Sequence, residues 1–164
     1  MKIIVKLLFI ALVISNSLYA NTHAGKHKKL PLAISLPYLK TIQPYAIELG
    51  SGPMDIHVFV DPKCPRSQEF MTLVSQSEKM QRLYHYHFYL YELKRFKSHP
   101  LITSIYSSKD RLKAMQAVMI KKTTIPTLEV NKKVRQIMKA IEKVGEALDV
   151  YKRPYLVLVR KGKQ

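Results

Sequence analysis

The chain has 164 residues, of which 47% are hydrophobic and 24% charged, a balance that indicates a globular protein and excludes a disordered one. Its 28 Lys and Arg against 11 Asp and Glu give a net charge of +17. The basic residues are scattered over every segment instead of gathered in one arm, so the composition does not favour a nucleic-acid-binding protein. A solvated basic surface, loosely attracted to anionic polymers or lipids of the cell envelope, is the simpler interpretation.

Residues 1–20 have the pattern of a signal peptide. Lys2 and Lys6 flank a short charged start, residues 7–15 form an apolar core, and Ala20 places a small residue at the cleavage point. The apolar core is well short of the roughly 20 residues that span a membrane, so an uncleaved anchor is the weaker alternative. We therefore expect export to the periplasm, with no stable membrane span after cleavage.

Residues 21–44 form a lead segment before the domain that we assign to residues 45–164. The lead begins polar and basic, and Pro31, Pro37 and Pro44 then break it into pieces no longer than a couple of helical turns. We expect short helical or extended pieces that pack against the domain.

The domain alternates between strand and helix patterns, which predicts an α/β fold. Ile56, Val58 and Val60 lie in a strand with two apolar faces, which is typical of a central strand. A strand, a helix and a second strand in this order predict a βαβ unit. The expected strands are 45–49, 55–61, 83–93 and 155–159. The expected helices are 65–83, one or two within 98–122, and 131–150.

Three histidines raise the question of a metal site. His85 and His87 lie two apart on one face of an expected strand, and His57 lies on the expected neighbouring strand. The spacing alone is weak evidence, and we identify no carboxylate or cysteine nearby in the sequence. We expect these histidines to be packed or hydrogen-bonded, and we assign no metal and no cofactor.

The chain contains a single cysteine, Cys64. A lone cysteine in an exported protein is buried and inert, free and reactive, or paired with another molecule. Cys64 directly precedes Pro65, at the start of an expected helix, where unpaired N–H groups and partial positive charge stabilise a thiolate. Lys63 and Arg66 add positive charge beside it, which favours a reactive thiol, although a lone cysteine in a strand-to-helix loop is more often an inert small hydrophobe.

The segment "IHVFVDPKCPRSQEF" resembles the strand, active-site loop and helix of the periplasmic thioredoxin-fold thiol:disulfide interchange family of the DsbC/DsbG type. "IYSSKDRLKAMQAVMIKKTTIP" is similar to the helical insertion of that family. "IEKVGEALDVYKRPYLVLVRKGK" is similar to its last long helix, cis-proline loop and following strand. The resemblance covers most of residues 55–163 and implies a thioredoxin-like fold with a helical insertion.

The resemblance also implies roles for individual residues. Cys64 matches the nucleophilic cysteine, and Arg66 matches one of the variable positions that follow it. Pro154 matches the cis-proline that faces the active site, so Arg153, Pro154 and Tyr155 would form the substrate-binding loop.

Three departures from the family change the expectation. Ser67 replaces the second, resolving cysteine, and would donate a hydrogen bond to the Cys64 thiolate. Arg153 replaces a small or β-branched residue, and its guanidinium would favour the thiolate further. The chain ends at Gln164, where the fold normally adds a strand and a helix, so a sheet edge beside residues 155–159 would allow a dimer.

These features predict a monothiol protein of thiol–disulfide exchange, with Cys64, Ser67 and Arg66 as its catalytic residues. Without a resolving cysteine, the mixed disulfide needs an external thiol or a second substrate cysteine for its release. The expected partners are exported polypeptides with cysteines or a low-molecular-weight thiol, together with an external reductant. The alternative is a non-catalytic thioredoxin-like module that binds extended polypeptide.

Overall fold

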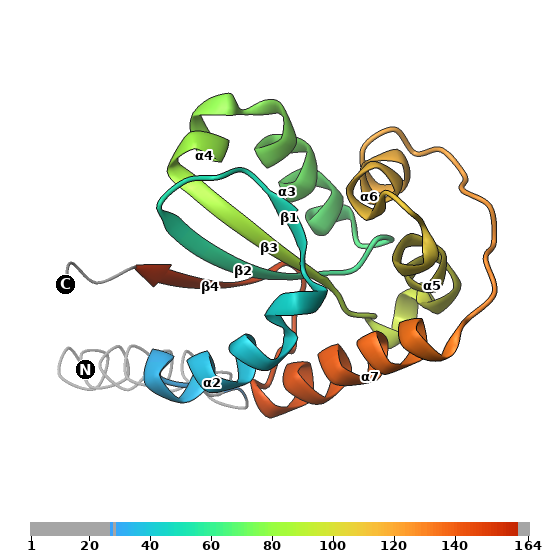
Figure 1. Cartoon of the computed structure of the whole chain (residues 1–164). Helices are drawn as coiled ribbons and strands as arrows, with labels where there is room; N and C mark the ends of the chain where they lie inside the picture. Colours follow the sequence, from blue (N-terminus) through green and yellow to red (C-terminus); the bar gives the residue numbers. More distant parts are fainter. Residues whose placement is uncertain (1–26, 28, 161–164) are drawn as a thin grey trace, which may run out of the picture.

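The protein is built around one mixed four-stranded sheet in the order β1-β3-β2-β4 (Figure 1). The computed structural model describes residue 27 and residues 29–160, so the expected signal peptide lies outside the described residues. The central strands β2 and β3 are parallel, while β1 pairs with β3 and β4 with β2 in antiparallel fashion. The predicted βαβ unit is therefore confirmed. The strands are β1 Ile47–Leu49, β2 Met54–Val60, β3 Tyr84–Leu90 and β4 Tyr155–Arg160.

Helices cover both faces of the sheet and one of its ends. In Figure 1, α2 and α7 lie below the sheet, α3 and α4 lie above it, and α5 and α6 form the end on the right. The pair α5 and α6 is inserted between β3 and α7, which agrees with the expected helical insertion. The α-helices are α2 Leu32–Ile42, α3 Pro65–Gln76, α4 Glu78–Leu83, α5 His99–Ser107, α6 Arg111–Met119 and α7 Lys132–Ala147, and the short 3-10 turns are η1 Gln43–Tyr45 and η2 Lys94–Phe96. None of the described helices combines the length and the apolar composition that a membrane crossing requires.

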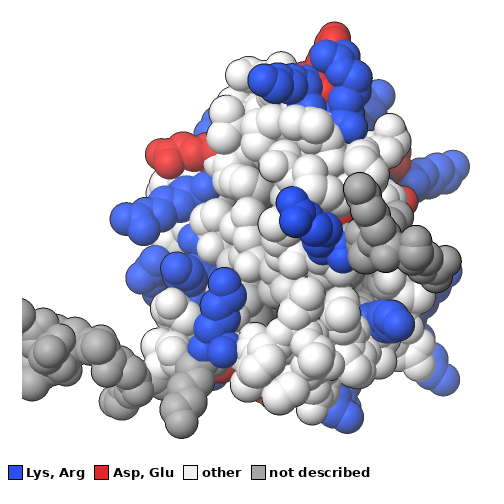
Figure 2. All heavy atoms as spheres, turned by 90° about the vertical axis from the view of Figure 1, so that its left-hand side faces the viewer, with Lys and Arg blue, Asp and Glu red and all other residues white. Residues whose placement is uncertain are grey.

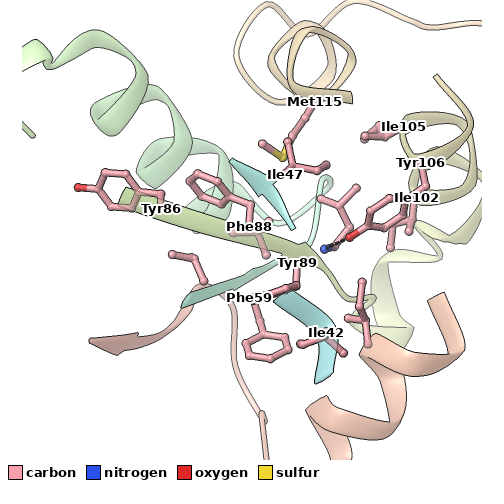
Figure 3. Close-up of a cluster of buried hydrophobic side chains, with 14 of the residues drawn as sticks. Ile42, Ile47, Phe59, Tyr86, Phe88, Tyr89, Ile102, Ile105, Tyr106 and Met115 are labelled. Carbon is pink, nitrogen blue, oxygen red and sulfur yellow. Dashed lines mark hydrogen bonds between the residues drawn. The ribbon is translucent and has the colours of Figure 1, made fainter. Parts of the chain in front are cut away.

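The core forms on both faces of the central strands because their side chains alternate in direction. Tyr86 and Phe88 of β3 lie on the face covered by α3, where Phe70 makes edge-on ring contacts with both. Phe59 of β2 lies on the opposite face, near Ile42 of α2 (Figure 3). The central position and two apolar faces predicted for β2 are confirmed.

Two helices differ from the prediction. The helix expected over residues 65–83 is divided into α3 and α4, because Ser77 has an extended backbone and its Oγ accepts a hydrogen bond from the Met80 N–H at 3.3 Å. In the lead segment, α2 continues through Pro37 instead of breaking there. Leu39 and Ile42 of α2 are fully buried and α2 packs against α7, so tertiary contacts outweigh the hydrogen bond that Pro37 removes.

The charged surface agrees with the dispersed pattern expected from the sequence. Figure 2 shows Lys and Arg distributed around the rim of one face, with few Asp and Glu among them.

The outer strand of the described sheet, β4, exposes apolar side chains. Leu156 and Leu158 on this strand are 39% and 53% exposed. The expected dimer through this edge stays a prediction.

Candidate active site

Cys64 is the N-cap residue of α3, with Pro65 as the first helical residue. Its backbone is extended (φ −74°, ψ 119°), and its N–H donates to the Asp61 carbonyl at 3.0 Å. The Cys64 carbonyl in turn accepts from the Gln68 N–H at 3.0 Å. The sulfur therefore lies at the positive end of the helix, as the sequence predicted, although Cys64 is only 3% exposed.

The loop before β4 lies directly against Cys64. The Arg153–Pro154 peptide bond is cis, as the resemblance implied. The Cys64 thiol donates to the Arg153 carbonyl oxygen at 3.6 Å. Tyr155 begins β4, and its ring makes an edge-on contact with Phe59, so much of this side chain packs into the core. The substrate-binding role of this loop stays a prediction.

The Arg153 side chain holds this loop in place. Its guanidinium donates to the carbonyls of Tyr91 and Val150 at 2.9 Å each, and it lies 4.0 Å from the centre of the Tyr91 ring. Burial lowers the pKa of Arg153 to about 10, while the nearby Tyr91, Asp61 and Cys64 act in the opposite direction. The hydrogen bond between Cys64 and Arg153 is made by the Arg153 backbone carbonyl, so any effect of the guanidinium on the thiolate is electrostatic and acts over a longer range. That effect stays a prediction.

Asp61 is a site residue that the sequence interpretation missed. It is fully buried, and its carboxylate accepts hydrogen bonds from Lys63 N–H at 2.8 Å, Leu93 N–H at 2.6 Å and Ser98 Oγ at 2.8 Å. The bond to Lys63, two residues on, is the Asx turn that an Asp-Pro sequence after a strand favours. Asp61 therefore fixes the path of the chain into Cys64.

The other two predicted catalytic residues, Arg66 and Ser67, lie in the first turn of α3. Ser67 is fully buried in the first turn of α3, and its Oγ accepts a hydrogen bond from the Asp61 N–H at 3.3 Å. Its own hydroxyl hydrogen is not used by that bond, and the expected donation to the Cys64 thiolate stays a prediction. Arg66 is exposed and points to the rim of a groove.

A groove of about 660 Å³ opens beside Cys64. Its lining combines basic and aromatic side chains and includes no acidic residue. Arg95 lies 4.9 Å from the ring centre of Phe96, and Lys152 lies 5.6 Å from that of Tyr151. This chemistry suits a negatively charged or aromatic segment next to a disulfide. The lining residues are Cys64, Pro65, Arg66, Leu93, Arg95, Phe96, Tyr151, Lys152 and Arg153.

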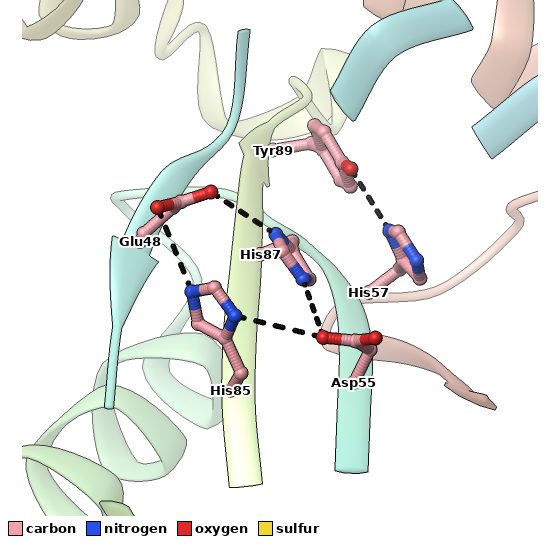
Figure 4. Close-up of polar contacts among 6 residues, drawn as sticks. All are labelled: Glu48, Asp55, His57, His85, His87 and Tyr89. Carbon is pink, nitrogen blue, oxygen red and sulfur yellow. Dashed lines mark hydrogen bonds and ion pairs between the residues drawn. The ribbon is translucent and has the colours of Figure 1, made fainter. Parts of the chain in front are cut away.

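The three histidines lie elsewhere, toward the start of β2 and β3. His57 and His87 are neighbours across these strands, with ring centres 4.8 Å apart, as the alternation predicted. The interpretation that no carboxylate lies nearby was wrong. Glu48 of β1 and Asp55 of β2 both lie within 3.5 Å of histidine ring nitrogens (Figure 4).

Comparison with known proteins relates this arrangement to solved structures. No protein-family model matches the chain, and no curated protein matches its sequence. The catalytic domain of Proteus mirabilis ScsC is 15% identical, with a TM-score of 0.64 over 80% of this chain and 88% of that one. Helicobacter pylori DsbG is 16% identical, with a TM-score of 0.58 over 77% and 61% of the two chains. A disulfide interchange protein from Neisseria gonorrhoeae is 19% identical, with a TM-score of 0.55 over 70% and 80%.

At these identities the similarity is one of fold. It extends over 80% of this chain in the comparison with ScsC. The chain therefore has a thioredoxin-like fold, which it shares with DsbG, ScsC and the disulfide interchange protein.

Proposed function

We propose that this protein is an exported monothiol protein that carries out thiol–disulfide exchange in the periplasm. The observation that supports this most is the position of Cys64, at the N-terminus of α3 and 3.6 Å from the carbonyl of the cis-proline loop. A solved structure of the same fold, from Neisseria gonorrhoeae, is named a disulfide interchange protein, which supports the same reaction class. Ser67 in place of a second thiol limits this protein to reactions that pass through an intermolecular disulfide.

The reaction needs no net oxidant or reductant when it rearranges disulfides. Cys64 releases its proton to solvent, and the thiolate attacks one sulfur of a substrate disulfide. The Cys64–substrate S–S bond forms, the original S–S bond breaks, and the displaced sulfur leaves as a thiolate. A second thiolate, from the same substrate or a small thiol, then attacks the substrate sulfur, which forms the new disulfide and restores the Cys64 thiolate.

The surrounding residues have distinct roles in this proposal. Asp61 holds the loop that carries the nucleophile, and Arg153 holds the facing loop against Tyr91. Arg66 and Lys152 on the groove rim place positive charge where a displaced thiolate develops.

A second candidate function, a non-catalytic module that binds extended polypeptide, is favoured by one observation. Cys64 is only 3% exposed. This degree of burial is typical of an inert cysteine, and it also fits a shielded nucleophile. In that case the groove beside Phe96 and Tyr151 would bind polypeptide, and the thiol would take no part.

Mixed-disulfide formation separates the two candidates. The purified protein is incubated with oxidised glutathione and with a scrambled disulfide-containing protein, and adducts are counted by intact mass. We expect one glutathione per wild-type chain and recovery of the native substrate when a little reduced thiol is present. Cys64→Ala should lose both while keeping its cooperative unfolding. A wild-type protein that binds unfolded polypeptide but forms no adduct would leave only the binding function.

A further inference from the structure

Four polar side chains converge on one face of the sheet, far from the groove. The strand register pairs Glu48 of β1 with His87 of β3, and Asp55 of β2 with His85 of β3. Directly paired residues point to the same side of a sheet, so the register brings all four together. Figure 4 shows the two imidazoles lying between the two carboxylates.

Each imidazole uses its two nitrogens in opposite directions. Toward Glu48, His85 Nε2 and His87 Nδ1 each lie 3.5 Å from a carboxylate oxygen. Toward Asp55, His85 Nδ1 lies 3.5 Å and His87 Nε2 lies 3.1 Å from the same oxygen, Oδ1. The 3.1 Å contact is a hydrogen bond. Asp55 therefore holds both rings from one side, and Glu48 faces them from the other.

The hydrogen bond from His87 to Asp55 leaves the other ring nitrogen of His87 as an acceptor without a donor. A neutral imidazole carries one N–H, and in His87 the hydrogen bond from Nε2 to Asp55 uses it. His87 Nδ1 is then left with a lone pair, in a side chain that is 1% exposed and has no hydrogen-bond partner for this atom. It faces the Glu48 carboxylate, which is also an acceptor. Two acceptors that face one another favour a cation between them.

We propose that Glu48, His85 and His87 bind one divalent transition-metal ion, of which Zn²⁺ is the representative. The candidate ligand atoms all lie within 4.8 Å of one another. Zn–N and Zn–O bonds of about 2.0–2.2 Å in tetrahedral geometry separate neighbouring ligand atoms by roughly 3.3–3.5 Å, which the 3.5 Å contacts to Glu48 match. Two imidazoles with one carboxylate form a ligand set that suits Zn²⁺ and its neighbours in the first transition row.

Asp55 has the position of an outer carboxylate in such a site. Histidines that ligate a metal commonly donate their other N–H to a carboxylate, which fixes the tautomer and directs the lone pair at the metal. Asp55 accepts a hydrogen bond from His87 Nε2 and lies 3.5 Å from His85 Nδ1, on the side away from Glu48. The Glu48 side chain is 54% exposed and that of His85 26%, so the solvent side is open for a fourth ligand.

His57 packs against the cluster that Glu48, Asp55, His85 and His87 form. Its ring stacks on that of His87, and its Nδ1 lies 2.9 Å from the Tyr89 hydroxyl.

The metal site and the thiol are separate centres. Asp55 and Asp61 lie six residues apart along an extended segment, which corresponds to about 20 Å. Cys64 follows Asp61 at the far end of β2, so it cannot be a ligand of the same ion. Because Glu48 lies on the three-residue strand β1, a bound ion would join this short outer strand to β3.

Zn²⁺ titration of a thiol-free protein tests this proposal. Protein carrying Cys64→Ser is treated with a chelator, and Zn²⁺ is added alone in a calorimeter. We expect one Zn²⁺ per chain and a rise in the melting temperature with Zn²⁺ concentration. Co²⁺ should replace it with the visible absorption of a tetrahedral nitrogen–oxygen site.

Two substitutions at partly exposed ligands avoid disturbing the buried His87. Glu48→Gln should weaken Zn²⁺ binding at least tenfold. The double variant Glu48→Gln with His85→Gln should no longer bind one Zn²⁺ per chain. His99→Gln, which removes an exposed imidazole on α5, is the matched control and should bind like the parent. The unfolding transition of each variant without metal shows whether the variant is folded.

Either of two results would contradict the proposed metal site. A Cys64→Ser protein with no saturable Zn²⁺ binding, or with binding that folded Glu48→Gln and His85→Gln variants retain, would overturn the metal site. Because the parent lacks the thiol, neither result affects the proposed disulfide exchange.

Discussion

Asp61 links the segments that surround the nucleophile. Its carboxylate accepts from the backbone of Lys63, just before Cys64, and from Leu93 and Ser98, which follow β3. All three bonds are made by a side chain with no exposed surface. Removing such an acceptor leaves buried donors unpaired, which costs more than the net value of the bonds themselves.

Replacement of Asp61 by Asn should therefore destabilise the protein and slow the reaction of Cys64. The amide would turn an N–H₂ group toward backbone or hydroxyl donors. We expect the free energy of unfolding to fall by about 2–4 kcal/mol in denaturant titrations, and alkylation of Cys64 to become slower. Asp110→Asn is the matched control, because Asp110 is exposed and caps α6 through one bond, a role that Asn fills equally well. Equal losses in the two variants would contradict this role of Asp61.

Ser67→Cys should convert the monothiol site into a dithiol site. Cys-x-x-Cys at a helix N-terminus is the spacing of reversible redox dithiols. We expect an intramolecular disulfide, seen as loss of two free thiols on oxidation, and insulin reduction at least tenfold faster than the very slow wild type. Ser67→Ala is the control and should gain no activity. A Ser67→Cys protein that folds but forms no internal disulfide would show that Cys64 does not face this position.

At the scale of elements, α7 supports the cis-proline loop through one close contact. A Cβ atom at Gly145 would lie 2.3 Å from Cε1 of Tyr91. The Tyr91 ring in turn lies 4.0 Å from the Arg153 guanidinium, whose hydrogen bonds hold the loop. The helix, the aromatic ring and the loop therefore form one packed stack.

Gly145→Ala should push the Tyr91 ring, and with it the cis-proline loop, away from α7. The added methyl group overpacks the contact with Tyr91, which costs about 1–3 kcal/mol, while Ala gains up to about 1 kcal/mol in helix propensity. We expect a net loss of stability in denaturant titrations and a changed alkylation rate at Cys64. Lys143→Ala, on an exposed position of the same helix, controls for propensity and should leave both unchanged. A Gly145→Ala protein as stable as the wild type would mean that Tyr91 moves aside freely.

The sequence predicted the elements better than the contacts between them. Alternating side chains identified β2 and β3, and the apolar stripe identified α7, because these periodicities are local. The break at Ser77 was missed because the apolar stripe continues across it. Glu48 and Asp55 beside the histidines depend on strand register, and the bonds from Asp61 to Leu93 and Ser98 join residues more than 30 positions apart. The Asx turn at Asp61 was the one local sign of that role.

At the scale of the whole molecule, charge should govern which disulfides react. The chain carries +17, and the groove beside Cys64 is lined by Arg66, Arg95 and Lys152. Positive charge in a cleft raises the local concentration of anions, and salt screens this attraction over roughly 10 Å at 0.1 M.

The rate of adduct formation should therefore depend on salt only for charged disulfides. We expect the reaction with anionic oxidised glutathione to slow several-fold between about 0.02 M and 0.5 M salt, and that with neutral hydroxyethyl disulfide to stay constant. Lys152→Ala should reduce the salt dependence, whereas Lys139→Ala on α7 should not. Equal salt dependence for both disulfides would exclude electrostatic selection by the groove.

The outer position of β4 has a consequence for the exchange of amide hydrogens with solvent. In an antiparallel pair, alternate residues direct their N–H groups to the neighbour, and the residues between them direct theirs outward. β4 pairs only with β2 among the described residues, so every second amide from Tyr155 to Arg160 should exchange within the dead time of a deuterium experiment. The amides of β2, which lies between β3 and β4, should instead all be protected from exchange, with no alternation between neighbouring residues.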